Sequence, residues 1–139
     1  DDEDANENPA QDENLEADGT CEAPEPLAFG QHAGSTRGAP EAERGQCGGS
    51  GAEMVYSFSV AAQTQVCVNT TGSAIDTVLY VRAHQCNNAQ AEVACNDDAR
   101  GVQSAITLMA NPGTTYFVVV DSYNASGDFT LNVQPGFCP

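Results

Sequence analysis

Residues 75–100 read IDTVLYVRAHQCNNAQAEVACNDDAR. This stretch gives the most direct prediction of the chain's architecture. Residues 77–82 (TVLYVR) and residues 91–96 (AEVACN) are two short runs containing the apolar and β-branched residues that are typical of β-strands. A polar segment centred near Asn88 separates the two runs. We therefore predict an antiparallel β-hairpin that carries two cysteines, Cys86 and Cys95.

Further strands are predicted on both sides of this hairpin, at residues 54–60, 64–69, 103–109, 115–121 and 129–133. Residues 115–121 (TYFVVVD) are apolar almost throughout, as in a central strand that is covered on both faces. Short strands with turns at this spacing predict an all-β fold, an antiparallel β-sandwich of jelly-roll type stapled by disulfides.

Charge divides the chain into two parts. Nine of the 20 acidic residues lie within residues 1–18, and the chain has four arginines and no lysine. We predict an acidic N-terminal extension over residues 1–20, too poor in apolar residues to fold alone, and a single domain over residues 21–139. The chain offers no basic surface for nucleic acid. It also lacks the run of about 18 apolar residues that a membrane span requires.

The cysteines indicate the compartment. Six cysteines in a short chain without lysine predict disulfide bonds formed in an oxidising environment. The chain begins at Asp1 without an apolar leader, so we expect a mature secreted protein, extracellular or at the cell surface. A zinc site made by Cys86, Cys95 and His84 is the alternative to a disulfide, which is favoured because no CxxC pair is present.

The pairing of the cysteines is a separate prediction, since six cysteines allow 15 connectivities. A bond between Cys86 and Cys95 would close the hairpin loop. The remaining bonds that we predict are Cys21–Cys47, which ties down the segment before the first regular strand, and Cys67–Cys138, beside the last strand.

From about Cys47 to Val133 the sequence resembles the bacterial pre-peptidase C-terminal domain family. The resemblance is carried, in order, by CGGSGAEMVYSFSV (47–60), GSAIDTVLYVR (72–82), CNDD (95–98) and NPGTTYFVVVDSYNASGDFTLNV (111–133). It implies a compact β-sandwich of jelly-roll type. Members are usually non-catalytic modules attached to secreted hydrolases, and related collagen-binding modules of bacterial collagenases bind calcium.

Several oxygen-bearing side chains are expected at one end of the hairpin. Asp76 opens the first strand, and Asn96, Asp97 and Asp98 follow the second. Carboxylate and amide oxygens are the ligands that calcium prefers, so these four residues form a candidate calcium site. The alternative is that Asp76 caps a turn, Asn96 and Asp97 accept backbone hydrogen bonds, and Asp98 is solvated. Tyr123, in the turn before the last strand, is a candidate for stacking on a sugar or peptide.

Two functions are consistent with these features. One is a non-catalytic structural subunit that assembles into a filament or surface layer, its acidic extension held by a neighbouring copy through cations or through Arg37, Arg44, Arg82 or Arg100. The other is a secreted, calcium-dependent accessory module of a hydrolase system that binds a polysaccharide or a protein. The sequence favours the first, because the extension alone would be disordered. Catalysis is not expected, because no nucleophile stands at a recognisable spacing from His32 or His84.

Overall fold

The computed structural model describes residues 19–97, 103–122 and 126–138. These ranges hold one short 3-10 helix, Ala89–Ala91, and β-strands throughout the rest of the regular structure, so the all-β prediction is confirmed. The strands are β1 (Glu25–Pro26), β2 (Gly30–Ser35), β3 (Met54–Phe58), β4 (Thr64–Asn69), β5 (Thr77–Ala83), β6 (Glu92–Asn96), β7 (Ala105–Ala110), β8 (Tyr116–Ser122) and β9 (Asp128–Pro135).

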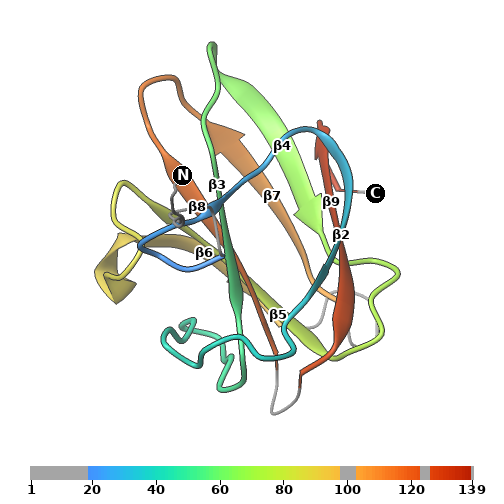
Figure 1. Ribbon diagram of the computed structural model, residues 1–139. Coiled ribbons are helices and arrows are strands. Elements are labelled where there is room, and N and C mark those ends of the chain that lie inside the picture. Colours follow the sequence, from blue (N-terminus) through green and yellow to red (C-terminus); the bar gives the residue numbers. More distant parts are fainter. Residues whose placement is uncertain (1–18, 98–102, 123–125, 139) are drawn as a thin grey trace, which may run out of the picture.

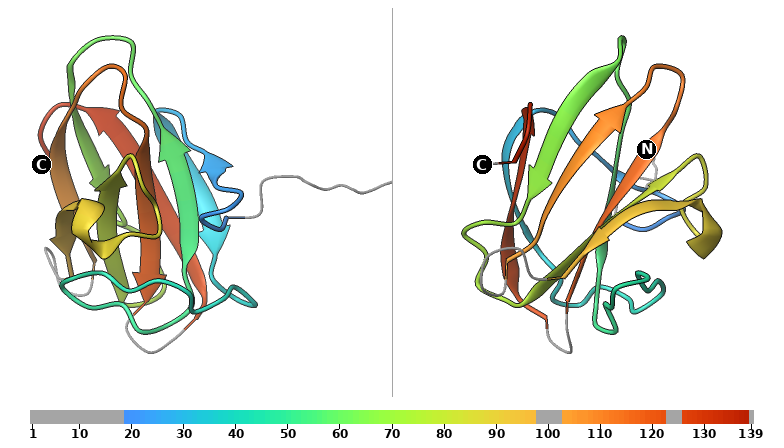
Figure 2. Two further views of the ribbon diagram at one scale, coloured as in Figure 1. Left: turned by 90° about the vertical axis from the view of Figure 1, so that its left-hand side faces the viewer. Right: turned by 180° about the vertical axis from the view of Figure 1, so that it is seen from behind.

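The strands form two stacked sheets, as Figures 1 and 2 show. One sheet has the order β1-β3-β8-β5-β6 and the other the order β2-β9-β4-β7. Every pairing is antiparallel except that of β1 with β3. The hairpin of β5 and β6 and the central place of β8 agree with the sequence analysis.

The core lies between the sheets because successive side chains of a strand point to opposite faces. The inward positions of β3, β5 and β8 meet those of β4, β7 and β9. The buried apolar side chains there are Leu27, Tyr56, Val66, Val68, Leu79, Val81, Ile106, Ala110, Tyr116, Val118, Val120, Phe129, Leu131 and Val133.

The outer face of the five-stranded sheet is covered by the chain itself. Residues 36–53, which we call the strap, cross it between β2 and β3 (Figure 2, left). The strap packs so closely that a Cβ on Gly45 would lie 2.5 Å from the Tyr80 ring. Val55, Val78 and Val119 are also buried on this face, in a second apolar cluster.

The disulfides correct two predictions and agree with one. Cys67 is bonded to Cys138, as expected. Cys86 is bonded to Cys21 and Cys95 to Cys47, so the predicted Cys86–Cys95 and Cys21–Cys47 bonds are wrong.

The register of the hairpin explains the error. Cys95 lies opposite Tyr80, well inside the hairpin, whereas Cys86 lies beyond the end of β5 at Ala83. The strand residues from Tyr80 to Ala83 alone span about 10 Å, and a disulfide requires Cα atoms roughly 4.4–6.8 Å apart. Each cysteine instead meets a covering segment of the same sheet, Cys95 the strap and Cys86 the segment before β1.

Candidate functional site

The predicted calcium ligands lie near one end of the β5–β6 hairpin. Leu79 pairs with Asn96, and Asp76 immediately precedes β5. The Asn96 side chain accepts a hydrogen bond of 3.1 Å from the Ala105 N–H, as the alternative interpretation expected of this residue. Asp98 lies outside the described residues.

These residues do not by themselves make a calcium site. Calcium takes six to eight oxygen ligands, and carboxylates supply most of the charge. In the part of the chain that the structure describes, no group of three or more Asp, Glu, His or Cys side chains is placed to hold a metal ion. The calcium hypothesis therefore depends on Asp98 and stays a prediction. Tyr123, the predicted stacking residue, also lies outside the described ranges.

A buried arginine holds the strap against the five-stranded sheet. Arg82 is 1% exposed and pairs with the carboxylates of Glu43 at 2.7 Å and Glu92 at 3.3 Å. It also donates to the backbone carbonyls of Arg44 and Cys86, both at 2.7 Å. Arg82 is therefore unavailable to the acidic extension of a neighbour, and this part of the filament hypothesis is wrong.

Two buried carboxyl groups lie where the strap meets the five-stranded sheet, Glu53 at the end of the strap and Asp121 on β8. Glu53 is 2% exposed; its Oε2 accepts hydrogen bonds from the N–H groups of Ala42 and Glu43, and its Oε1 has no hydrogen-bond partner among the described residues. Asp121 is fully buried and accepts from the Tyr80 hydroxyl at 2.9 Å and from the Ser122 N–H at 2.7 Å.

The two carboxyl groups have raised pKa values. Burial, followed by the charge of Asp121, raises the pKa of Glu53 to about 7. Burial raises the pKa of Asp121 to about 7, although its hydrogen bonds act in the opposite direction. Burial and Asp121 also raise the pKa of the Tyr80 hydroxyl. A buried carboxyl with an unpartnered oxygen, close to a second buried carboxyl, is suited to hold a proton, and we interpret this cluster as a structural anchor of the strap.

The outer face of the four-stranded sheet is different, because the strap meets it at the edge, where Arg37 contacts Asp128 and Ser35. We call its outward-pointing side chains the open face, and the strand registers define them. They are Gln31, Ala33 and Ser35 on β2; Asp128, Thr130, Asn132 and Gln134 on β9; Gln65, Cys67 and Asn69 on β4; and Ala105, Thr107 and Met109 on β7.

The open face is almost free of charge. Among its side chains Asp128 alone is ionisable apart from the disulfide-bonded Cys67, and Arg37 pairs with its carboxylate. Five of the side chains are amides and three are hydroxyls, in a chain whose net charge is −16. A neutral hydrogen-bonding surface on so acidic a protein is the feature that best distinguishes one face from the other.

The amides form a row across three strands. Gln31 on β2 donates to Asn132 Oδ1 at 3.2 Å, and Asn132 on β9 donates to Asn69 Oδ1 on β4 at 2.9 Å. Asn132 also donates to the Thr71 carbonyl at 3.1 Å. These hydrogen bonds fix the orientation of the amides and so order the surface.

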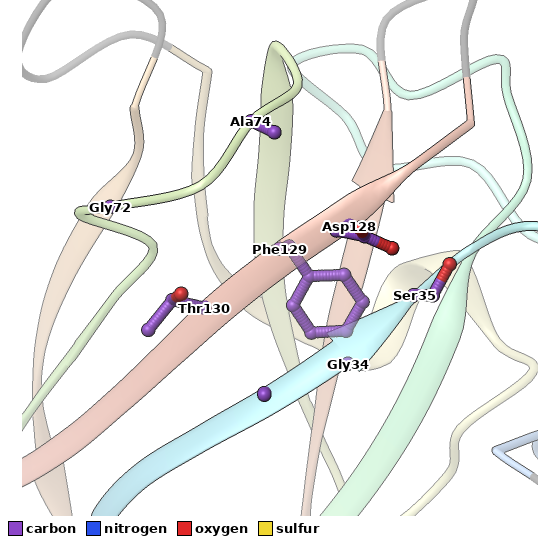
Figure 3. Close-up of a pocket in the computed structure, with 8 residues that line it drawn as sticks. Gly34, Ser35, Gly72, Ala74, Asp128, Phe129 and Thr130 are labelled. Carbon is purple, nitrogen blue, oxygen red and sulfur yellow. The ribbon is translucent and has the colours of Figure 1, made fainter.

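A groove of about 520 Å³ continues the open face beyond the amide row. Figure 3 shows Thr130 and Asp128 on β9 between two walls, the loop of Gly72 and Ala74 on one side and β2 with Ser35 on the other. The walls are made largely by small residues, and a Cβ on Gly72 would already lie 3.7 Å from Thr130 Oγ1.

Two exposed apolar residues lie at the end of the open face that is opposite to the groove. Met109, 47% exposed, is on the open face opposite Gln65. Phe137, 73% exposed, lies between Gly136, whose N–H donates to the Gln65 carbonyl, and Cys138, whose N–H donates to Thr107 Oγ1. The last residues therefore cross β4 towards β7 and carry Phe137 to this end of the face.

The sequence analysis did not single out these residues. The signal was present, because Gln65, Asn132 and Gln134 occupy the polar positions of strands whose alternate residues are apolar. What the sequence alone did not reveal is that β9 and β4 are neighbours, with Asn132 opposite Asn69.

Comparison with known proteins identifies relatives of this fold. The family model of the bacterial pre-peptidase C-terminal domain matches residues 53–122, just over half of the chain. The structure is similar to that of the pre-peptidase C-terminal domain of a collagenase from Bacillus anthracis, with 20% sequence identity and a TM-score of 0.51. That match covers 79% of this chain and 93% of the other.

A second similar structure is PliG of Aeromonas hydrophila, a periplasmic inhibitor of g-type lysozyme, with 15% identity and a TM-score of 0.55. It covers 81% of this chain and 95% of that chain. At these identities both structures support the fold alone. No curated protein sequence matches the chain.

Proposed function

The chain belongs to the bacterial pre-peptidase C-terminal domain family, and from this premise we propose that it is a non-catalytic, secreted binding module. Its docking surface is the open face of the four-stranded sheet, and its ligand is an extracellular polymer. The proposal extends the second function expected from the sequence and gives it a location.

The contrast between the two outer faces carries this proposal. On the five-stranded sheet, the outward side chains of Val78, Tyr80 and Asp121 are fully buried under covering segments. On the four-stranded sheet, Gln31, Gln134 and Met109 are exposed. A sheet whose inner face packs in the core and whose outer face is covered is closed to ligands. A broad, exposed strand face instead offers contact area for a partner.

The disulfides support secretion. The structure contains three of them, and such bonds persist in oxidising compartments. In the described ranges no helix is long and apolar enough to cross a membrane. The structural neighbour PliG is periplasmic, and we extend an extracytoplasmic location to this chain as part of the proposal.

The filament hypothesis is tested by size in solution. It rests on residues 1–20, and residues 1–18 lie outside the described ranges. Sedimentation velocity on the full chain, and on a variant lacking residues 1–18, distinguishes the two functions. A binding module sediments as a monomer of 14.5 kDa in the full-length form. Large species that disappear with the deletion would instead support assembly through the extension.

Binding is tested by co-sedimentation with insoluble polymers of different chemistry, namely cellulose, chitin, collagen fibrils and elastin. We expect retention on at least one polymer and loss of retention when the open face is blocked by Ala33→Trp. The matched control is Val93→Trp on β6, since Val93 is 51% exposed on the other sheet. Retention of wild type on none of the polymers, or equal retention of all three proteins, would refute the proposal.

A further inference from the structure

We propose that the ligand of the open face is a neutral polysaccharide chain, which lies along β9 from the groove to Phe137. This inference rests on the proposed function and names its ligand class.

Charge argues first against anionic and cationic polymers as the ligand. An anionic polysaccharide would approach a chain of net charge −16 and find no unpaired cation on the open face, because Arg37 is paired with Asp128. A cationic ligand would require free carboxylates, and Asp128 is the only carboxylate on this face. A ligand without charge is the one that fits.

The polar groups of the face complement hydroxyl groups. An amide offers two N–H donors and a carbonyl acceptor, and a hydroxyl both donates and accepts, so each matches a sugar hydroxyl in either role. In the row formed by Gln31, Asn132 and Asn69, the exposed Gln31 and the half-buried Asn132 present such groups at fixed positions, and the buried Asn69 holds Asn132 in place. Gln134 continues the same line of side chains along β9.

The shape matches an extended chain rather than a compact ligand. From Asp128 to Gln134 the outward positions of β9 extend over about 20 Å, at roughly 3.3 Å per residue. The groove lies at the Asp128 end of β9. Its walls are low enough to admit a sugar ring, because they are made by the small residues Ala33, Gly34, Gly72 and Ala74. Beyond the other end stands Phe137, whose exposed ring offers a flat apolar surface to the apolar face of a sugar.

The test is affinity electrophoresis of the full chain in native gels. The gels contain hydroxyethyl cellulose, laminarin, galactomannan or dextran as neutral probes, and alginate as the anionic probe. We expect retardation by at least one neutral probe and none by alginate. We further expect Phe137→Ala to weaken binding about tenfold, a change on the scale of one aromatic contact.

Two other variants keep the result interpretable. Ala33→Trp fills the groove on an exposed strand position, where an aromatic residue is compatible with the β-structure, and should abolish retardation. Val93→Ala, on the opposite sheet, should leave it unchanged. Retardation that is unaffected by both Phe137→Ala and Ala33→Trp would overturn the assignment to this face.

The outcomes separate this inference from the proposed function. Retention on collagen or elastin that Ala33→Trp abolishes, without retardation by any neutral glycan, refutes the polysaccharide and leaves a binding module with a protein ligand. Formation of a dimer that Ala33→Trp dissociates, again without glycan binding, assigns the face to a second copy and refutes both. Binding to none of the polymers also refutes both.

Discussion

At the scale of single residues, Arg82 and Arg37 show how burial decides the value of an ion pair. Both have carboxylate partners, but Arg82 is 1% exposed whereas the Arg37 and Asp128 side chains are each 65% exposed. An exposed pair is screened by water and stabilises by roughly 0–1 kcal/mol. A buried pair whose cation is removed leaves an uncompensated buried carboxylate, which costs about 3–5 kcal/mol.

We therefore expect Arg82→Met to lower the free energy of unfolding by about 3–5 kcal/mol, because Glu92 has a nearly inaccessible side chain. Arg37→Met should lower it by less than about 1 kcal/mol. Urea denaturation of both variants, followed by circular dichroism, measures the difference. Equal losses would mean that the Arg82 network contributes no more than a surface pair.

Glu53 and Asp121 make stability depend on pH. Both carboxyl groups have pKa values of about 7 in the folded protein, raised from 4.5 and 3.8. In the unfolded chain they lose their protons near pH 4, so between about pH 4 and pH 7 the folded state binds more protons. The free energy of unfolding contributed by these groups must then fall as the pH rises through this window.

The variant Glu53→Gln isolates this effect. Its amide oxygen can keep the acceptor role of Oε2, and its amide nitrogen does not ionise. We expect the variant to be more stable than wild type at pH 8, by on the order of 2 kcal/mol, and nearly equal to it at pH 4.5. Thermal unfolding at several pH values measures both curves, and parallel curves would exclude Glu53 as the titrating group.

At the scale of elements, the strands were predictable and the covering segments were not. A half-buried strand carries its own signal, because its alternation of apolar and polar residues reports two different environments. β3 and β9 were predicted for this reason. The strap has little periodicity and few apolar residues, and it is positioned by contacts distant in sequence, such as Cys47 with Cys95 and Gln46 with Glu92. Local patterns contain no information about such contacts.

The same limit explains the site. Inward residues such as Leu131 and Val133 could be assigned from the sequence, and Asn132 therefore had to point outward. That Asn132 forms part of a continuous amide row required the strand order, since Gln31 is 101 residues away in sequence. Arg82 and Glu53 gave no sign of burial, because charged residues usually face solvent.

Two of the disulfides close loops of similar length but join different elements, so their removal can be compared directly. Cys47–Cys95 and Cys67–Cys138 span 48 and 71 residues, so loop closure alone predicts similar losses of about 4 kcal/mol for their removal. Only the first ties the strap to β6. In the double variant Cys47→Ser/Cys95→Ser, we expect limited trypsin digestion to cleave early after the exposed Arg44. In the double variant Cys67→Ser/Cys138→Ser, we expect no early cleavage there. Equal rates of cleavage at Arg44 would show that the strap is held without the disulfide.

At the scale of the whole molecule, the net charge of the chain and the neutrality of the open face both bear on association. The net charge of −16 keeps copies of the chain apart and acts against the compact state through self-repulsion. The open face carries little of this charge, because Asp128 is the one carboxylate among its side chains. A neutral face on a strongly charged body permits specific contact while discouraging self-association, as the proposed binding module requires.

This charge leads to a prediction that also tests the calcium hypothesis. Sodium chloride screens repulsion, so the melting temperature should rise between 10 and 150 mM salt, as the Debye length falls to about 8 Å. If Asp76, Asp97 and Asp98 bind calcium, millimolar calcium chloride should raise it further than sodium chloride of equal ionic strength. The variant Asp98→Asn should then lose the calcium increment and keep the response to sodium. Differential scanning calorimetry of both proteins in both salts gives the comparison. An equal response of wild type to the two salts would mean that these carboxylates act only through the overall charge.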